Sequence, residues 1–161
     1  MLERAPGGTR AVLDMLAVAG LMALAAQARF PLPFSPVPVT MQTFVALFAG
    51  YLVSRHRAAA GMALYCVLGL AGAPLFAVSS GATAGYLAAF VLAPYLTASF
   101  RSPLAGMAAA SLCIYALGAA WLCLFLGMTL PQACAVGVLP FMPGDAIKLI
   151  AAAQLAGWAR R

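Results

Sequence analysis

Charged residues are scarce in this sequence. They account for 7% of its 161 residues, whereas 65% are hydrophobic, and the mean hydropathy is +1.02. A soluble domain carries about a quarter charged residues, so this chain has too few of them to cover a surface exposed to water. The composition therefore excludes a soluble globular domain. It predicts an all-α integral membrane protein with a single transmembrane domain over residues 1–161.

Motifs of metal, cofactor and hydrolase chemistry are also missing. The cysteines form no C-x-x-C pair, and the single histidine, His56, cannot complete a metal site. No G-x-x-x-x-G-K-[ST], H-E-x-x-H or G-x-S-x-G sequence occurs, which argues against ATP binding by a P-loop and against these hydrolase classes. We expect neither an enzyme nor a resident cofactor, and we expect the four cysteines to be free, small apolar residues: Cys66, Cys113, Cys123 and Cys134.

Six apolar runs alternate with short breaks rich in proline, glycine or polar residues, and each predicts a membrane span. A span needs about 20 residues, within a range of about 17 to 25, so the second and fourth runs are short. The first run is too long for the apolar part of a signal peptide, so we expect it to be retained. The predicted spans lie near 11–28, 40–54, 58–78, 85–99, 103–127 and 143–158.

The basic residues predict the topology. The net charge is +6, but the basic residues stand singly or in small groups between apolar runs, which does not suit a nucleic-acid groove. Cytoplasmic loops are enriched in lysine and arginine. With both termini cytoplasmic, six spans leave Arg29 outside and place seven arginines inside: Arg4, Arg10, Arg55, Arg57, Arg101, Arg160 and Arg161.

Three segments then form the outer surface. Residues 29–39 contain four prolines, which predicts a stiff, extended segment. Residues 79–84 are small and polar, and residues 128–142 are apolar but interrupted by Pro131, Gly137 and Pro140. An apolar, broken segment at this depth has to be buried by protein. Two interpretations stay open for residues 128–142: a plain connector, or a cover over an outward-facing cavity.

The acidic residues differ in setting. Glu3 is close to the terminus, and we expect Asp14 to lie in the first helical turn of the first span, where an acid complements the helix dipole. Asp145 follows Pro143 at the predicted start of the last span, and Lys148 is the only lysine in the chain. Positions three apart share a helix face, and ionisable groups within a membrane are candidates for function. The pair is either a neutralised helix start or a ligand site on the outer side.

Other polar residues of the outer half are few. Thr40, Gln42 and Thr43 open the second span, and Thr83 and Tyr86 open the fourth. Together with Asp145 and Lys148 they would outline an apolar pocket with few polar groups, the usual form of a small-molecule site.

Ala19 and Ala23 lie four residues apart in the first span, a spacing that lets helices approach closely. The alanines would serve either packing within the bundle or docking of a partner.

Four segments together resemble the BioY biotin transporters. They are Pro33–Thr43 (PFSPVPVTMQT), Gly69–Ala77 (GLAGAPLFA), Gly85–Leu87 followed by Phe90, and Gly137–Asp145 (GVLPFMPGD) with Lys148. They stand in the family's order and extend over about Pro33 to Lys148. Any one of them is a weak signal, and the combination is specific.

The resemblance implies a six-helix S component, the substrate-binding subunit of an energy-coupling-factor (ECF) transporter, in the bacterial cytoplasmic (inner) membrane. Asp145 and Lys148 would anchor biotin, and Gln42, Thr43, Thr83 and Tyr86 would add weaker contacts. Ala19 and Ala23 would belong to the docking face. The implied partners are biotin, the lipid bilayer, a coupling membrane subunit and ATPase subunits. The alternatives are a carrier that acts alone, an S component for another vitamin, and a membrane assembly factor without a transported ligand.

Overall fold

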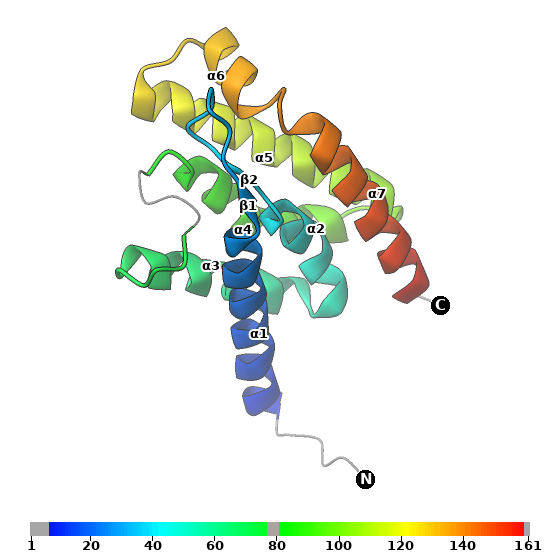
Figure 1. The fold of residues 1–161 in the computed structure, drawn as a ribbon. Helices are drawn as coiled ribbons and strands as arrows, with labels where there is room; N and C mark the ends of the chain where they lie inside the picture. Colours follow the sequence, from blue (N-terminus) through cyan, green and yellow to red (C-terminus); the bar gives the residue numbers. More distant parts are fainter. Residues whose placement is uncertain (1–6, 77–80, 160–161) are drawn as a thin grey trace.

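The computed structural model describes residues 7–76 and 81–159. Within these ranges the chain forms seven helices and one two-stranded antiparallel ribbon (Figure 1). The helices are α1 (Gly7–Gln27), α2 (Gln42–Leu52), α3 (Arg55–Leu70), α4 (Ala84–Ala98), α5 (Pro103–Leu126), α6 (Leu130–Gly137) and α7 (Met142–Ala159), and the strands are β1 (Arg29–Phe30) and β2 (Val39–Thr40). The predictions for Glu3, Arg4, Arg160 and Arg161, and for residues 79–80 of the second outer segment, lie outside the described residues.

Helix α5 shows how local sequence sets the ends of an element. Pro103 occupies the first turn, where its missing N–H costs nothing, and the Ser102 hydroxyl accepts a hydrogen bond from the Ala105 N–H at 3.4 Å. The helix ends at Gly127, which has a φ of +66°, a conformation that glycine adopts without steric cost. Helix α5 therefore extends over almost the same residues as the span predicted at 103–127.

Helix α3 is shorter than the sequence predicted. The span was expected to reach residue 78, but the helix ends at Leu70. Gly72 has a φ of +94°, and Pro74 follows, so the chain turns away from the helical path. An apolar composition alone did not reveal this end, because the residues after Leu70 remain mostly apolar.

The interrupted segment 128–142 contains a helix that the sequence did not predict. Thr129 and Gln132 form a reciprocal cap at the start of α6. The axis then bends by 59° between α6 and α7. The predicted break is confirmed, and α6 shows that part of the broken segment is helical.

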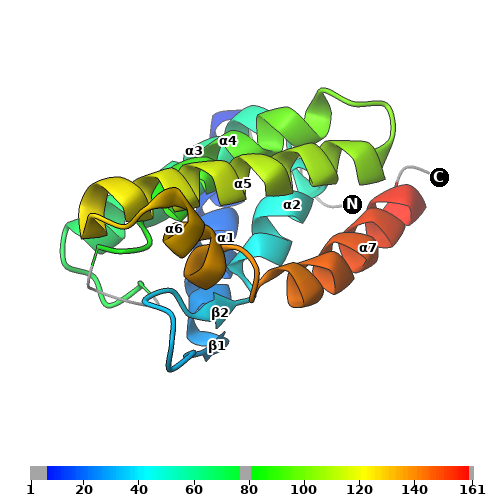
Figure 2. The same cartoon turned by 90° about the horizontal axis from the view of Figure 1, so that it is seen from above.

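The proline-rich segment forms a ribbon. Arg29 pairs with Thr40 and Phe30 pairs with Val39, so its two ends are extended strands, as predicted. The Ser35 hydroxyl donates a hydrogen bond to the Val136 carbonyl at 2.7 Å and so joins the ribbon to α6. The ribbon and α6 lie on one side of the molecule, away from the start of α1 and the end of α7 (Figures 1 and 2).

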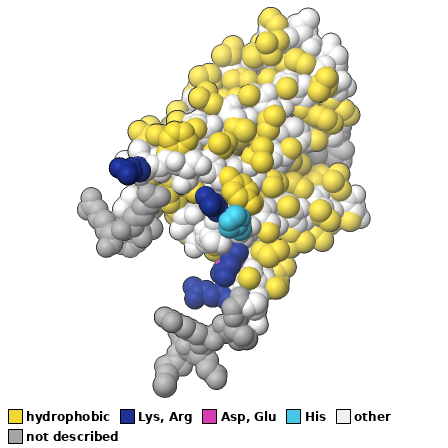
Figure 3. All heavy atoms as spheres, turned by 180° about the vertical axis from the view of Figure 1, so that it is seen from behind, with side chains coloured by type: hydrophobic (Ala, Val, Ile, Leu, Met, Phe, Trp, Pro, Cys, Tyr) yellow, Lys and Arg dark blue, Asp and Glu magenta, His cyan; other side chains and the backbone are white. Residues whose placement is uncertain are grey.

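The surface of the helical bundle is apolar. Figure 3 shows a face covered largely by hydrophobic side chains, with basic side chains confined to one end. Leu124, Leu70 and Ile147 are 81%, 80% and 71% exposed, which a monomer in water would not tolerate over so wide an area. Among the described helices, α1 and α5 are long and apolar enough to cross a bilayer, and the bent pair of α6 and α7 adds a third candidate.

The structure bears on two predictions about α1, the position of Asp14 and the role of Ala19 and Ala23. Asp14 does not lie in the first turn, because α1 already begins at Gly7; instead its carboxylate accepts a hydrogen bond from the Arg57 guanidinium of α3 at 2.7 Å. Ala19 is only 6% exposed and Ala23 is half-buried, so their side chains are occupied by packing within the chain. The structure therefore favours packing over docking for this pair.

Candidate ligand-binding site

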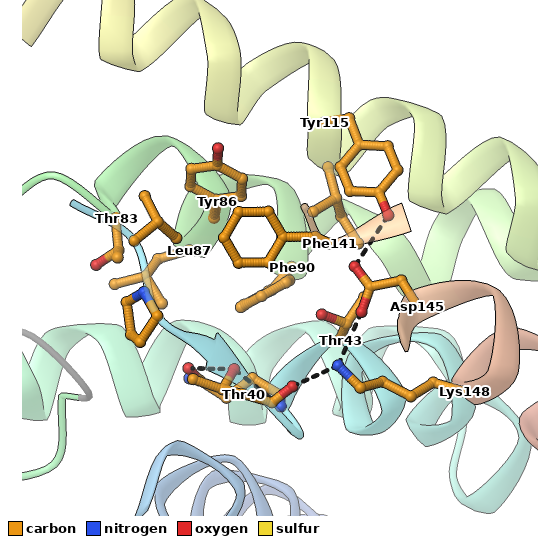
Figure 4. Close-up of a pocket in the computed structure, with 14 residues that line it drawn as sticks. Thr40, Thr43, Thr83, Tyr86, Leu87, Phe90, Tyr115, Phe141, Asp145 and Lys148 are labelled. Carbon is orange, nitrogen blue, oxygen red and sulfur yellow. Dashed lines mark hydrogen bonds and ion pairs between the residues drawn. The ribbon is translucent and has the colours of Figure 1, made fainter. Parts of the chain in front are cut away.

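A small cavity lies where β2, α2, α4, α5 and α7 meet (Figure 4). Its walls combine aromatic and aliphatic side chains with a few polar groups. The lining residues are Val37, Pro38, Thr40, Gln42, Thr43, Thr83, Tyr86, Leu87, Phe90, Ile114, Tyr115, Phe141, Asp145 and Lys148. All seven residues that the sequence placed around a pocket therefore line one cavity, although they come from a strand, three helices and a helix cap: Thr40, Gln42, Thr43, Thr83, Tyr86, Asp145 and Lys148.

Asp145 and Lys148 form a buried ion pair at this cavity. Lys148 Nζ lies 2.8 Å from Asp145 Oδ1, and the two side chains are 11% and 7% exposed, respectively. Both residues lie near the start of α7, three positions apart, as the helical spacing predicted. Burial of charged groups is costly unless they are paired and hydrogen-bonded, and this pair satisfies both conditions.

Two further groups complete the surroundings of the ion pair. Lys148 Nζ also donates to the backbone carbonyl of Thr40, at 2.6 Å, and the Tyr115 hydroxyl donates to Asp145 Oδ2, at 3.0 Å. Lys148 thereby joins α7 to the ribbon, and Tyr115 joins α5 to α7 (Figure 4). The sequence placed Thr40 at the pocket but did not predict its bond to Lys148, and it did not single out Tyr115. A hydroxyl in the middle of the apolar run 103–127 was the available signal for Tyr115.

Gln42 is held by a second group of hydrogen bonds. Its side-chain amide donates to the Tyr65 hydroxyl at 3.0 Å, and its carbonyl oxygen accepts from the Thr40 hydroxyl at 3.3 Å. Tyr65 in turn donates to the Leu75 carbonyl at 3.2 Å. Gln42 is 4% exposed. Its orientation is therefore fixed by neighbours, and it brings a preformed polar group to the cavity wall.

Tyr86 reaches the cavity between two glycines. Its ring lies so close to Gly118 of α5 that a Cβ there would overlap it, and its hydroxyl lies against Gly137. That hydroxyl donates to the Gly137 carbonyl at 2.7 Å. The two glycines thus allow α4, α5 and α6 to close around one aromatic side chain, and the ring forms one end of the cavity.

The remaining walls are mainly apolar. Phe90, Phe141, Leu87 and Ile114 line the cavity with Val37 and Pro38, and the sequence pattern did not assign these residues to a site. Thr43 is buried, and Thr83 precedes α4 as its cap residue. Such walls, with a few convergent polar groups, are typical of small-molecule sites.

The polar groups of the cavity are suited to hydrogen bonding with a ligand. No group of three or more His, Cys, Asp and Glu side chains that could hold a metal ion occurs within the described parts of the chain. The pair instead presents an acceptor oxygen and a donor nitrogen side by side, within an apolar enclosure. The space open to the centre of a water molecule is about 40 Å³, which is enough for a few waters.

Comparisons with known proteins give the family. The model of the BioY family matches residues 2–161. The probable biotin transporter BioY of Pyrococcus horikoshii is 31% identical over 138 residues, which cover 80% of this chain and 84% of that protein. The biotin transporter BioY of Thermotoga maritima is 34% identical over 139 residues, with coverage of 78% and 82%.

A solved structure matches the fold. It is the S-component for biotin from an ECF-type ABC transporter, with a TM-score of 0.81 and 19% sequence identity, and the match covers 98% of this chain and 95% of that one. At that identity the likeness concerns the fold alone. The family model and the two relatives match most of the sequence itself, and the chain therefore belongs to the BioY family.

Proposed function

We propose that this protein binds biotin at the cavity between β2 and α7 and serves as the substrate-binding S component of an ECF-type transporter. The family, the biotin transporters among the relatives, and the fold of a biotin S-component support this function. It is the role of a transport subunit and not of an enzyme.

The observation that carries the proposal is the buried pair of Asp145 and Lys148 in an apolar cavity. Biotin has a cyclic urea, an apolar ring with a thioether, and a carboxylate. In a cyclic urea an N–H lies beside the C=O, so one edge offers a donor and an acceptor together. Asp145 and Lys148 offer the complementary acceptor and donor, 2.8 Å apart. We therefore assign the ureido edge to this pair and the apolar rings to the aromatic wall.

Gln42, Thr43, Thr83 and Tyr86 complete the proposed site as neighbouring contacts. All four line the same cavity, and Gln42 and Tyr86 are already fixed by hydrogen bonds.

For the membrane arrangement we propose six spans, formed by α1 to α5 and α7, with both termini cytoplasmic. The arginine distribution supports it, and α6 with the ribbon then covers the outer end. Helix α2 has 11 residues, or about 16 Å at 1.5 Å per residue. It is shorter than the bilayer core, so we expect flanking residues to complete this span. The membrane is the cytoplasmic membrane of the cell.

Labelling of introduced cysteines tests this arrangement. His56 and Phe34 are exposed. In a chain whose native cysteines are replaced, a thiol reagent that does not permeate the membrane should label Phe34→Cys in intact cells. It should label His56→Cys only after the cells are opened. The opposite pattern would overturn the proposed topology.

The function is tested by equilibrium binding of labelled biotin to the purified protein, in competition with other vitamins. We expect saturable, one-to-one binding that unlabelled biotin abolishes. Binding of another vitamin in its place would show an S component of different specificity, and binding of none would favour an assembly factor. Biotin uptake in an auxotrophic host, with and without coupling and ATPase subunits, then separates an ECF subunit from a carrier that acts alone.

A further inference from the structure

Tyr115 occupies a position that the proposed function does not yet use. Its hydroxyl donates to Asp145 Oδ2 at 3.0 Å, while Asp145 Oδ1 accepts from Lys148 at 2.8 Å. Each carboxylate oxygen therefore has one partner, one from α5 and one from α7 itself. Two bonds at opposite oxygens fix the plane of the carboxylate, whereas Lys148 alone would leave it free to turn.

Tyr115 and Asp145 also separate two hollows. One is the proposed biotin cavity, and the other is a groove of about 260 Å³ between α5 and α7. Both residues line both spaces. The groove is otherwise lined by Ala108, Ser111, Leu112, Met142, Ala146 and Leu149. The phenol and the carboxylate thus form part of the wall between the cavity and the groove.

Ser111 provides a second hydroxyl of α5 for comparison with that of Tyr115. It lies one helical turn from Tyr115 on the same groove and is 8% exposed. Its hydroxyl has no hydrogen-bond partner among the described residues. Both hydroxyls belong to residues that line the groove, but only that of Tyr115 bonds to Asp145. A hydroxyl on this groove is therefore not sufficient for the contact, which depends on the position of Tyr115.

We propose that Tyr115 is a positioning residue for the biotin site. It holds the Asp145 carboxylate in the orientation that accepts the ureido N–H, and it does so before the ligand arrives. Ordering a group in advance reduces the entropy lost on binding, and in a site of low dielectric a misdirected carboxylate is costly. This inference rests on the proposed function and adds a residue that determines specificity within it.

The test compares Tyr115→Phe with Ser111→Ala as a matched control. Both variants remove one hydroxyl from the same groove. We expect Tyr115→Phe to weaken biotin binding about tenfold, and Ser111→Ala to change it less than twofold. Thermal melts of both variants establish that they are folded.

A second ligand separates positioning from a merely structural role. Biotin methylated on both ureido nitrogens has no ureido N–H to donate to Asp145. The ratio of the two affinities, biotin over its methylated analogue, should fall at least threefold in Tyr115→Phe, because the carboxylate no longer aims at that N–H. This ratio is independent of the fraction of folded protein.

Each outcome decides a different claim. Unchanged affinity in Tyr115→Phe, or an equal loss for both ligands together with a lower melting temperature, would overturn the positioning role while leaving biotin binding intact. A wild-type protein that does not bind biotin would overturn the proposed function and this inference together.

Discussion

Two ion pairs of this protein have nearly the same N···O distance and different surroundings. Arg57 lies 2.7 Å from Asp14, and Lys148 lies 2.8 Å from Asp145. The side chains of the first pair are 35% and 22% exposed, and those of the second are 11% and 7% exposed. Distance alone would rank them as equals.

The surroundings decide what each pair can do. An exposed ion pair contributes about 0 to 1 kcal/mol, because water and salt screen it. A buried pair stabilises little in net terms, yet the loss of one partner leaves an uncompensated charge and costs about 3 to 5 kcal/mol. The Asp14–Arg57 pair is thus a dispensable link between α1 and α3. The Asp145–Lys148 pair is bonded to Thr40 and Tyr115 and borders a cavity, as a ligand anchor requires.

The largest expected effect comes from removal of one partner of the buried pair. Asp145→Asn and Lys148→Ala should each weaken biotin binding about ten- to a hundredfold, since a charge-assisted hydrogen bond contributes about 1.5 to 3 kcal/mol. The measurement is equilibrium binding beside a thermal melt. Unchanged affinity with a lowered melting temperature would make the pair a structural element and remove it from the site.

Removal of both partners sharpens the distinction between stability and binding. Lys148→Met alone leaves the carboxylate of Asp145 buried without its cation, so it should lower the melting temperature. Asp145→Leu combined with Lys148→Met should recover part of that loss, because no charge is left without its partner. The recovery is not complete, since the Thr40 carbonyl and the Tyr115 hydroxyl lose their hydrogen bonds. Biotin binding should be weak in both variants. Binding by the double variant would contradict the anchor.

Gln42→Leu should have an intermediate effect. It removes the bond to the Tyr65 hydroxyl and a polar group from the cavity wall, and a neutral hydrogen bond contributes about 0.5 to 1.5 kcal/mol. We expect a two- to tenfold loss of biotin affinity in a titration. The matched control is Gln154→Leu, which changes an exposed glutamine on α7. An equal effect of both substitutions would argue against a role for Gln42 in the site.

The smallest effect is expected at the partly exposed pair of Asp14 and Arg57. Asp14→Asn and Arg57→Ala should lower the free energy of unfolding by about 0 to 1 kcal/mol and leave biotin affinity unchanged. High salt should reduce this loss of unfolding free energy, because salt screens charges that are in contact with water. Loss of binding in either variant would show that the two pairs do not differ as described.

The sequence predicted the elements better than the contacts between them. Pro103 and Gly127 mark the ends of α5 by their own backbone chemistry, and four prolines made the ribbon segment recognisable. The end of α3 at Leu70 depends on the turn at Gly72 and was not visible in an apolar run. Short helix α6 was missed because Pro131 was interpreted as an interruption, whereas it lies in the first turn of that helix.

In the candidate site, too, the sequence predicted the contact within one helix and not the contacts between distant segments. Asp145 and Lys148 are three residues apart, so helical spacing alone brought them together. The Thr40 carbonyl is 108 positions from Lys148, and Tyr115 is 30 positions from Asp145. Such contacts depend on how the helices pack. A backbone carbonyl carries no signal in the residue type, and Tyr115 resembled one more aromatic residue in an apolar helix.

The most direct test of the central claim is the rise in melting temperature that biotin produces. A ligand at one hundred times its dissociation constant stabilises the folded protein by about 2.7 kcal/mol. At that one concentration, wild type and Arg57→Ala should show the same rise, and Lys148→Ala should show at most about half of it. A full rise in Lys148→Ala, or a reduced rise in Arg57→Ala, would contradict the assignment of the buried pair as the biotin anchor.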